Sequence, residues 1–337
     1  MRMMRRNSIT DISGLKVGNA HHDSVFTGVT VLLPERPAVA AVDIRGGGPG
    51  TRECDALGLA GSIDEVHAIV LSGGSAFGLS AATAVQAWLA ERGRGFRVRG
   101  AVVPIVPQAI LFDLLNGGDK SWGRHPPYEL LALRACESAG EEFALGSVGA
   151  GFGATTANLR GGLGSASAEG PIGIEVGALA AVNPVGSVTV GDTAHFWAAP
   201  YEQDREYGGL GWPPQISPAE RAPRLKGAPG ESTTLAIVAT NARLCKRQAH
   251  RLAVMAQTGM ARAIHPVHTP LDGDIVFALA TGEVALQDPV YDLARLGAAA
   301  ADTLARAIAR AVYEASPAPP GWAGPPAYRS RFPGRGR

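Results

Sequence analysis

Short apolar runs typical of buried strands alternate with amphipathic helix patterns along most of this chain, and this alternation restricts its fold more than any other feature. The strand-like runs lie at 25–31, 37–44, 65–71, 101–107, 174–182, 185–190, 233–240 and 274–280, and the helix patterns at 79–91, 128–139, 246–259 and 293–315. Strands that alternate with helices in this way predict an α/β domain built in layers.

The charge balance limits the partners that such a domain can have. The chain has 337 residues with 31 Lys+Arg against 30 Asp+Glu, which gives a formal net charge of +1. Binders of nucleic acids and of membrane surfaces need a basic excess, so we expect neither partner. Hydrophobic residues make up 46% of the chain and charged residues 18%, which allows a packed core and excludes a charge-rich disordered protein.

Cysteine usage and the N-terminus bear on the compartment. Cys54, Cys136 and Cys245 stand far apart and form no CxxC pair, which argues against a zinc ribbon, a redox motif and a disulfide framework. The basic start of the chain is not followed by the apolar region of a signal peptide. No run of 18 apolar residues occurs either. We therefore expect a cytoplasmic protein.

Two glycine-rich loops are candidates for phosphate binding. They are Arg45-Gly-Gly-Gly-Pro-Gly-Thr51 and Ser72-Gly-Gly-Ser-Ala-Phe-Gly78. Backbone N–H groups in such loops can hold phosphate, but neither loop matches the P-loop or the dinucleotide fingerprint. The better interpretation is a pair of turns that let backbone segments pack closely, and we expect no cofactor.

The histidines offer a weaker candidate site. His21-His22-Asp23 and the pair His265 and His268 could bind a metal, but Pro266 and Pro270 break any helix that would present the second pair. A serine hydrolase triad could use one of these histidines, although no GxSxG elbow is present. We expect core or solvated histidines and no metal.

The junction before Thr233 is unusual. A polar segment rich in proline and glycine, at 201–230, runs directly into the strand-like run Thr233-Thr-Leu-Ala-Ile-Val-Ala-Thr240. If the chain were cut before Thr233, the new terminal residue would carry a hydroxyl and an α-amine, and the amine could act as base for its own hydroxyl. Threonine is also common at the start of strands, so the residues alone favour an ordinary strand start over a cut.

Seven sequence blocks in order resemble the L-aminopeptidase/D-esterase family of self-processing N-terminal-nucleophile hydrolases. The blocks lie at 43–53, 71–79, 104–113, 160–166, 182–186, 233–240 and 265–274, and the resemblance extends from Asp11 to about Ala315. Within the family the chain looks most similar to the threonine-nucleophile branch, which includes endohydrolases of nylon (6-aminohexanoate) oligomers.

The resemblance implies a four-layer αββα sandwich and a set of site residues. Thr233 matches the nucleophile, and the scissile bond is then Ser232–Thr233, which gives an α chain of 1–232 and a β chain of 233–337. Asn183 matches the side-chain donor to the oxyanion. Asp272 and Asp274 match an acidic pair beside the new amine. The hydroxyl of Thr234 is a neighbouring alternative nucleophile.

The resemblance also bears on partners and organisation. The implied substrates are small amides or peptides, and the implied assembly is a homotetramer of processed pairs. Residues 1–315 are expected to form a single domain. The tail at 316–337 is rich in proline, glycine and arginine, and we expect it to be disordered.

The chain departs from the family pattern at four positions. Asn158 stands where the threonine branch has a lysine that tunes the nucleophile, and Ser232 where Asn or Gly usually precedes the cut. Phe152 and Gln108 replace residues that are usually small. If Asn158 marks a lost cation, restoring lysine there should speed self-cleavage or turnover.

Two other functions stay open on the sequence alone. An unprocessed or weakly active relative could serve as a binding scaffold for small molecules or proteins. Acyl transfer, as in ornithine acetyltransferase, also uses a threonine freed by self-cleavage, but that enzyme's own motifs do not occur here. The sequence does not choose among peptide, β-peptide, nylon-oligomer and ester substrates.

Overall fold

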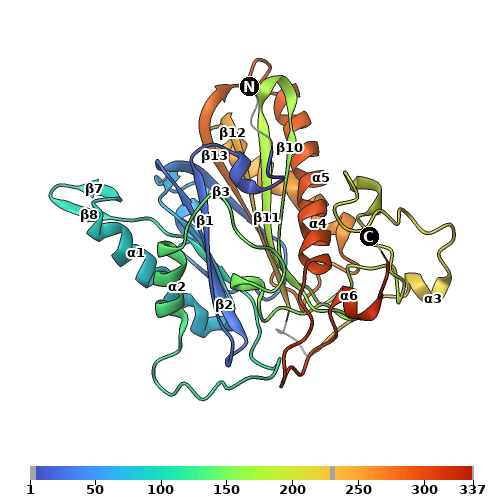
Figure 1. Cartoon of the computed structure of the whole chain (residues 1–337). Coiled ribbons are helices and arrows are strands. Elements are labelled where there is room, and N and C mark those ends of the chain that lie inside the picture. Colours follow the sequence, from blue (N-terminus) through green and yellow to red (C-terminus); the bar gives the residue numbers. More distant parts are fainter. Residues whose placement is uncertain (1–4, 228–231, 336–337) are drawn as a thin grey trace.

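A computed structural model describes residues 5–227 and 232–335 as two β-sheets packed face to face, with helices on the outer side of each. Figure 1 shows the four layers side by side, with α1 and α2 on one outer face and α4 and α5 on the other. Three separate hydrophobic clusters fill the spaces between successive layers. This arrangement confirms the predicted αββα sandwich.

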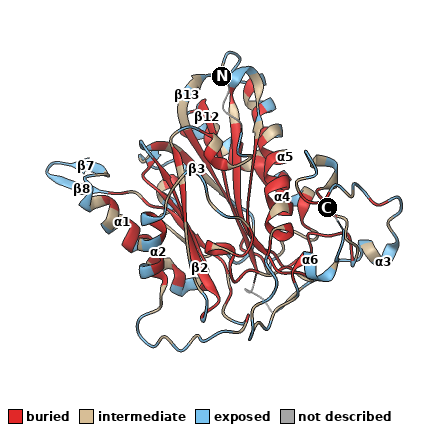
Figure 2. Cartoon of the chain, in the orientation of Figure 1, coloured by how far each residue is buried: buried red, intermediate tan, exposed pale blue. Residues whose placement is uncertain are grey.

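The smaller sheet has the strand order β1-β2-β6-β9-β4. Its strands are β1 (Leu15–His22), β2 (Thr27–Pro34), β6 (Ile69–Ser72), β9 (Gln108–Ile110) and β4 (Thr51–Arg52). Helices α1 (Ala81–Glu91) and α2 (Tyr128–Glu137) cover its outer face through a cluster rich in alanine and valine. A hairpin of β7 (Phe96–Val98) and β8 (Ala101–Val103) projects beyond α1 and is largely exposed (Figure 2).

The larger sheet has the strand order β10-β11-β12-β13-β3-β5. Its strands are β10 (Gly162–Glu169), β11 (Glu175–Asn183), β12 (Thr233–Arg243), β13 (Ile275–Ala285), β3 (Ala38–Ile44) and β5 (Glu65–Val66). Helices α4 (Lys246–Ala263) and α5 (Tyr291–Tyr313) cover its outer face. Only β12 and β13 pair in parallel; every other ladder of this sheet is antiparallel.

The central strand β12 is buried on both faces. Leu235 and Ile237 pack in the cluster between the two sheets, whereas Ala236 and Val238 pack toward α4 and α5. This alternation follows from the two-residue period of a strand. Thr233 therefore belongs to the face turned toward the other sheet, and Thr234 to the opposite face.

Short helical segments complete the chain. They are the α-helices α3 (Pro218–Arg221) and α6 (Tyr328–Arg331), and the 3₁₀ helices η1 (Ile9–Asp11), η2 (Asp55–Leu57), η3 (Ser75–Ser80), η4 (Gly149–Gly151), η5 (Pro171–Gly173) and η6 (Ala199–Tyr201). Among the described residues, none of the helices is both long and apolar enough to cross a bilayer.

Most predicted elements are present, but one predicted strand is absent, another is shortened, and several strands were not predicted. Residues 185–190, predicted as a strand, are buried but form only isolated bridges, in which Ser187 pairs with His265 and Thr189 with Phe196. Of the strand predicted at 101–107, only Ala101–Val103 forms a strand, which is β8. Strand β1 was not predicted, because its core side holds Leu15 and Val17 but its other positions are polar or small.

The expected disorder of the tail at 316–337 is wrong for residues 316–335, and residues 336–337 lie outside the described part. Tyr328 is fully buried and donates to Ala194 O at 2.7 Å, and its ring stacks on Phe196. The Arg160 guanidinium donates to Ser316 O and lies over the Trp322 ring. Aromatic anchors hold a segment whose proline and glycine content alone indicated disorder.

Candidate active site

Three strand ends of the larger sheet meet at one place. Strand β11 ends at Asn183, and the antiparallel register pairs this residue directly with Thr233, the first residue of β12. Because β13 runs parallel to β12, its start lies at the same end of the sheet, directly after Asp272 and Asp274. The topology thus brings together the four residues that the sequence selected as candidates from widely separated blocks.

The Thr233 hydroxyl lies on the carbonyl group that precedes it. Thr233 is 3% exposed, and its Oγ1 donates to Ser232 O at 2.6 Å. The same carbonyl oxygen accepts from Gly273 N at 2.9 Å. A Cβ built at Gly273 would stand 2.6 Å from Thr233 Oγ1, so only glycine allows this close approach.

On one side of Thr233 lies an acidic loop in which every carboxylate oxygen has donors. Asp274 Oδ1 accepts from Thr234 N at 2.8 Å, and Oδ2 accepts from His268 N at 3.0 Å and lies 2.9 Å from His268 Nδ1. Asp272 Oδ1 accepts from Val185 N at 2.9 Å, and Oδ2 from the backbone and hydroxyl of Thr269. Both aspartates are completely buried.

The two carboxylates therefore tie the acidic loop to β12 and to the segment after β11. Burial and the neighbouring Asp274 carboxylate raise the pKa of Asp272, and its hydrogen bonds from Val185 and Thr269 offset part of this rise. Within the described residues, neither carboxylate accepts a hydrogen bond from the Thr233 hydroxyl, which donates to Ser232 O. Their contacts are with the backbone that positions it.

The first glycine loop packs against this acidic loop. Gly46 N donates to Asp274 O and Gly48 N to Asp272 O. A Cβ built at Gly46 would lie 2.3 Å from Asp274 N. In the second loop, Gly78 O accepts from the Gln108 amide at 2.6 Å. The glycines have the packing role that the sequence predicted, and Gln108 is a buried structural residue.

On the other side of Thr233 lies an amide group with a cation bound to it. Asn183 Oδ1 accepts from Thr155 N at 2.9 Å and from Lys226 Nζ at 2.8 Å, while Asn183 Nδ2 donates to Phe112 O at 3.1 Å. The sequence did not select Lys226. The sequence feature that could have indicated it is that Lys226 is the only lysine in the proline- and glycine-rich segment at 201–230.

The structure does not bring Asn158 against the other candidates. Its Nδ2 donates to Thr189 Oγ1 at 3.0 Å and to Gly191 O at 3.2 Å, and its Oδ1 accepts from Thr156 Oγ1. The hydroxyl of Thr234 is buried, lies on the opposite face of β12 and has no hydrogen-bond partner within the described ranges. Phe152, the fourth departure from the family pattern, stacks on His21.

A cavity of about 300 Å³ borders the amide side. Its lining includes Phe112, Thr155 and Lys226, the three residues whose polar atoms bind the Asn183 side chain, and Ala323 to Pro325 of the C-terminal tail. Asp113 also lines it and is almost fully buried, which raises its pKa to about 6 despite the hydrogen bonds from Thr27 and Gly74.

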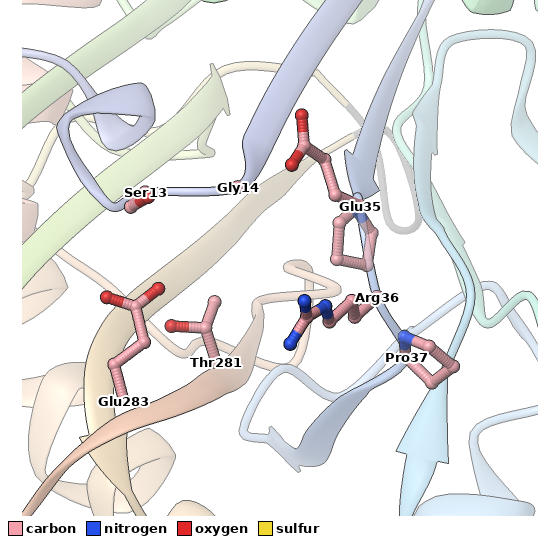
Figure 3. Close-up of a pocket in the computed structure, with 8 residues that line it drawn as sticks. Ser13, Gly14, Glu35, Arg36, Pro37, Thr281 and Glu283 are labelled. Atoms are coloured by element: carbon pink, nitrogen blue, oxygen red, sulfur yellow. The ribbon is translucent and has the colours of Figure 1, made fainter.

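A second cavity, of about 290 Å³, lies elsewhere (Figure 3). Figure 3 shows Glu35, Arg36 and Glu283 around it, with Thr281 from β13. Thr281 follows Ile275 by six positions along one strand, roughly 20 Å from the start of β13. This cavity is therefore separate from Thr233.

The histidines do not form a metal centre in the described part of the chain, which contains no cluster of three or more His, Cys, Asp or Glu suited to a metal ion. His268 binds Asp274, and His265 Nε2 lies 3.1 Å from Arg221 O. His21 is occupied by its stack with Phe152.

Comparisons with known proteins agree with this fold. The profile of Peptidase family S58 matches residues 7–321. An uncharacterised aminopeptidase of Mycobacterium tuberculosis (strain ATCC 25618 / H37Rv) is 43% identical, over 97% of this chain and 98% of the relative. A 6-aminohexanoate-oligomer endohydrolase of Kocuria sp. (strain KY2) is 31% identical, over 82% of this chain and 75% of the relative.

Solved structures share the architecture at low sequence identity. A β-aminopeptidase of Burkholderia sp. superposes with a TM-score of 0.70 at 22% identity, covering 97% of this chain and 92% of that chain. The L-aminopeptidase D-Ala-esterase/amidase of Ochrobactrum anthropi, described as a variant of the Ntn hydrolase fold, superposes with a TM-score of 0.70 at 20% identity, covering 98% and 95%. These neighbours place the fold among the Ntn hydrolases.

Proposed function

This chain belongs to Peptidase family S58, and we propose that it cuts its own Ser232–Thr233 bond and then hydrolyses amides with Thr233 as an N-terminal nucleophile. Its relatives include proteins named as an aminopeptidase and as a 6-aminohexanoate-oligomer endohydrolase. The observation that carries this proposal is the 2.6 Å contact of Thr233 Oγ1 with Ser232 O, a carbonyl that Gly273 N also holds.

In the proposed self-cleavage, Thr233 Oγ1 attacks the carbonyl carbon of Ser232. The Gly273 N–H then stabilises the negative charge that develops on Ser232 O. The C–N bond breaks, the nitrogen of Thr233 takes the proton of the hydroxyl, and an ester links Ser232 to Oγ1. Water hydrolyses this ester, which leaves a carboxylate on Ser232 and a free amine and hydroxyl on Thr233.

In the proposed turnover, the new amine of Thr233 accepts the proton of Oγ1 as the hydroxyl attacks a substrate amide. An α-amine has an ordinary pKa of about 7.7–8.0, which suits a base near neutral pH. Asn183, paired directly opposite Thr233, is the side-chain amide best placed to stabilise the oxyanion. Water then releases the acyl group from Oγ1.

The substrate class follows from the cavity beside Asn183. About 300 Å³ is enough for a short acyl chain, and Phe112 is among the residues that line this cavity. Linear aliphatic amides and short peptides fit this description, and a relative named for 6-aminohexanoate oligomers supports the same class. A scaffold without activity is less well supported, because Thr233, Asn183 and the two aspartates lie together at one end of the larger sheet.

The test of this proposal is the length and N-terminus of the purified chain. We expect fragments 1–232 and 233–337 on a denaturing gel, with Edman sequencing of the shorter one giving Thr233-Thr234-Leu235. Thr233→Ala removes the attacking oxygen, so this variant should stay in one piece and hydrolyse none of a panel of peptides and aliphatic amides.

Thr234→Ala is the matched control, because it deletes a hydroxyl from the opposite face of the same strand. This control should still process and turn over. Cleavage of the Thr233→Ala protein at the same bond, or loss of processing in Thr234→Ala alone, would show that the nucleophile is not Thr233.

A further inference from the structure

Lys226 is held on the site by contacts with two segments. Its Nζ donates to Asn183 Oδ1 at 2.8 Å, Asn183 O at 3.2 Å, Thr155 Oγ1 at 2.9 Å and Thr155 O at 2.5 Å. Its backbone N donates to Val185 O at 3.0 Å. Both ends of this residue are therefore fixed to the chain that leaves β11.

These contacts set the orientation of the Asn183 amide. Thr155 N and the Lys226 ammonium can only donate, so the Asn183 atom that faces them must be the oxygen. The amide nitrogen is then directed to the other side, where it meets Phe112 O. A cation on the oxygen also polarises the amide, which makes its N–H groups stronger donors.

We propose that Lys226 is the positioning residue for Asn183 in both self-cleavage and turnover, an inference that rests on the proposed function. It supplies a cation directly to the oxygen of the Asn183 side chain. Lys226 comes seven residues before Thr233, on the segment that ends at the proposed cut. After the cut, Lys226 would belong to the first chain and Thr233 to the second, and both would contribute to one site. The residue acts on the reaction through the Asn183 amide.

The matched variants are Lys226→Met, which removes the charge and keeps a straight side chain one atom shorter, and Lys226→Arg, which keeps the charge. Arg224→Met serves as control, because Arg224 lies on the same segment but binds Asp192. We expect Lys226→Met to lower kcat and the rate of self-cleavage by about 10- to 100-fold, the loss expected for one charge-assisted hydrogen bond. Its KM should change by less than about threefold, and Arg224→Met should leave all three quantities unchanged.

Chemical rescue separates positioning from folding. Lys226→Cys should be as slow as Lys226→Met, and alkylation of the folded variant with 2-bromoethylamine rebuilds an ammonium at nearly the same reach. Recovery of at least half of the lost kcat would support the proposal, together with a kcat for Lys226→Arg that lies between those of the wild-type protein and Lys226→Met. Alkylated wild-type protein is the control, because Cys245 is exposed.

The outcomes are distinguishable from those of the proposed function. A wild-type protein that is cut and active, with Lys226→Met equal to it, overturns the role of Lys226 alone. A slow Lys226→Met variant whose Lys226→Cys counterpart gains nothing on alkylation also overturns that role. A wild-type protein that stays uncut and inactive overturns both proposals.

Discussion

The two sides of Thr233 differ in burial: the acidic side is enclosed, and the amide side borders a cavity. On the acidic side, Asp272 and Asp274 are fully buried and every carboxylate oxygen accepts from nearby donors. On the amide side, Asn183 is bound by residues that line a cavity of about 300 Å³. The acidic side holds backbone in place, and the amide side borders the cavity in which we propose that a substrate binds.

This difference predicts that folding stability depends mainly on the acidic side and that reaction rates depend mainly on the amide side. Removing an acidic-side carboxylate leaves buried donors without partners, which costs folding free energy. Changing the amide side alters groups that a substrate would reach. Variants on the acidic side should therefore move the unfolding curve, and those on the amide side should move the rates.

Asp274→Ala should have the largest effect on stability. It leaves Thr234 N and the backbone of His268 without their acceptor, and unsatisfied buried donors cost about 1–3 kcal/mol each. We expect a loss of about 4 kcal/mol in the free energy of unfolding, measured by urea titration. The Thr233→Ala background keeps the protein as one chain during that measurement.

Asp23→Ala is the control for Asp274→Ala, because the Asp23 side chain is 89% exposed. Its unfolding midpoint should move by less than about 0.5 kcal/mol. If Asp274→Ala were no more costly than this control, the acidic side would not be the structural half of the site.

Asp113 extends the comparison to pH, because it is a buried carboxyl on the cavity side. Burial raises its pKa from 3.8 to about 6. Below pH 3.8 both the folded and the unfolded chain hold this proton, and between pH 3.8 and 6 the unfolded chain releases it first. Stability from this group is therefore present at low pH and is lost as the pH rises through about 6, by about 3 kcal/mol.

Asp113→Asn should remove this dependence. The unfolding free energy of the variant, minus that of the parent, should rise steadily between pH 4 and 6.5 and then level off. Urea titrations at five pH values in the Thr233→Ala background measure this difference. A constant difference across that range would mean that Asp113 titrates normally in the folded protein.

Asn158→Lys should have the smallest effect. The sequence suggested that lysine here would speed the reaction, but Asn158 donates to Thr189 and Gly191 rather than to Thr233 or Asn183. Lysine cannot copy both bonds, so we expect a stability loss of about 1 kcal/mol with no gain in kcat/KM. A tenfold faster enzyme would restore the original expectation.

Much of the site could be predicted because its residues lie in compact sequence blocks at strand ends. Thr233 opens a strand that is buried as far as Ala242, and Asp272 and Asp274 immediately precede another strand. Their convergence then follows from topology, because β11 ends where β12 and β13 begin. The αββα layers were recognised through the same blocks.

Lys226 and the tail could not be predicted, because no periodicity marks them. Lys226 lies in an irregular segment, where a side chain's position depends on tertiary contacts alone. In the tail, prolines and glycines suggested disorder, whereas Trp322 and the buried Tyr328 attach it to the rest of the domain. The contacts of Asn158 could not be predicted either, because the sequence gives no side-chain direction in a glycine-rich turn.

The strand order of the larger sheet has a consequence for the two chains that the proposed cut would produce. Strands β12 and β13 of the second chain lie between β11 and β3 of the first. The second chain also returns to the first at Asn116 and Arg160. The pieces could separate only by tearing the sheet along two ladders, so the mature enzyme should survive extreme dilution as one unit. Halves expressed apart would instead expose bare strand edges and aggregate.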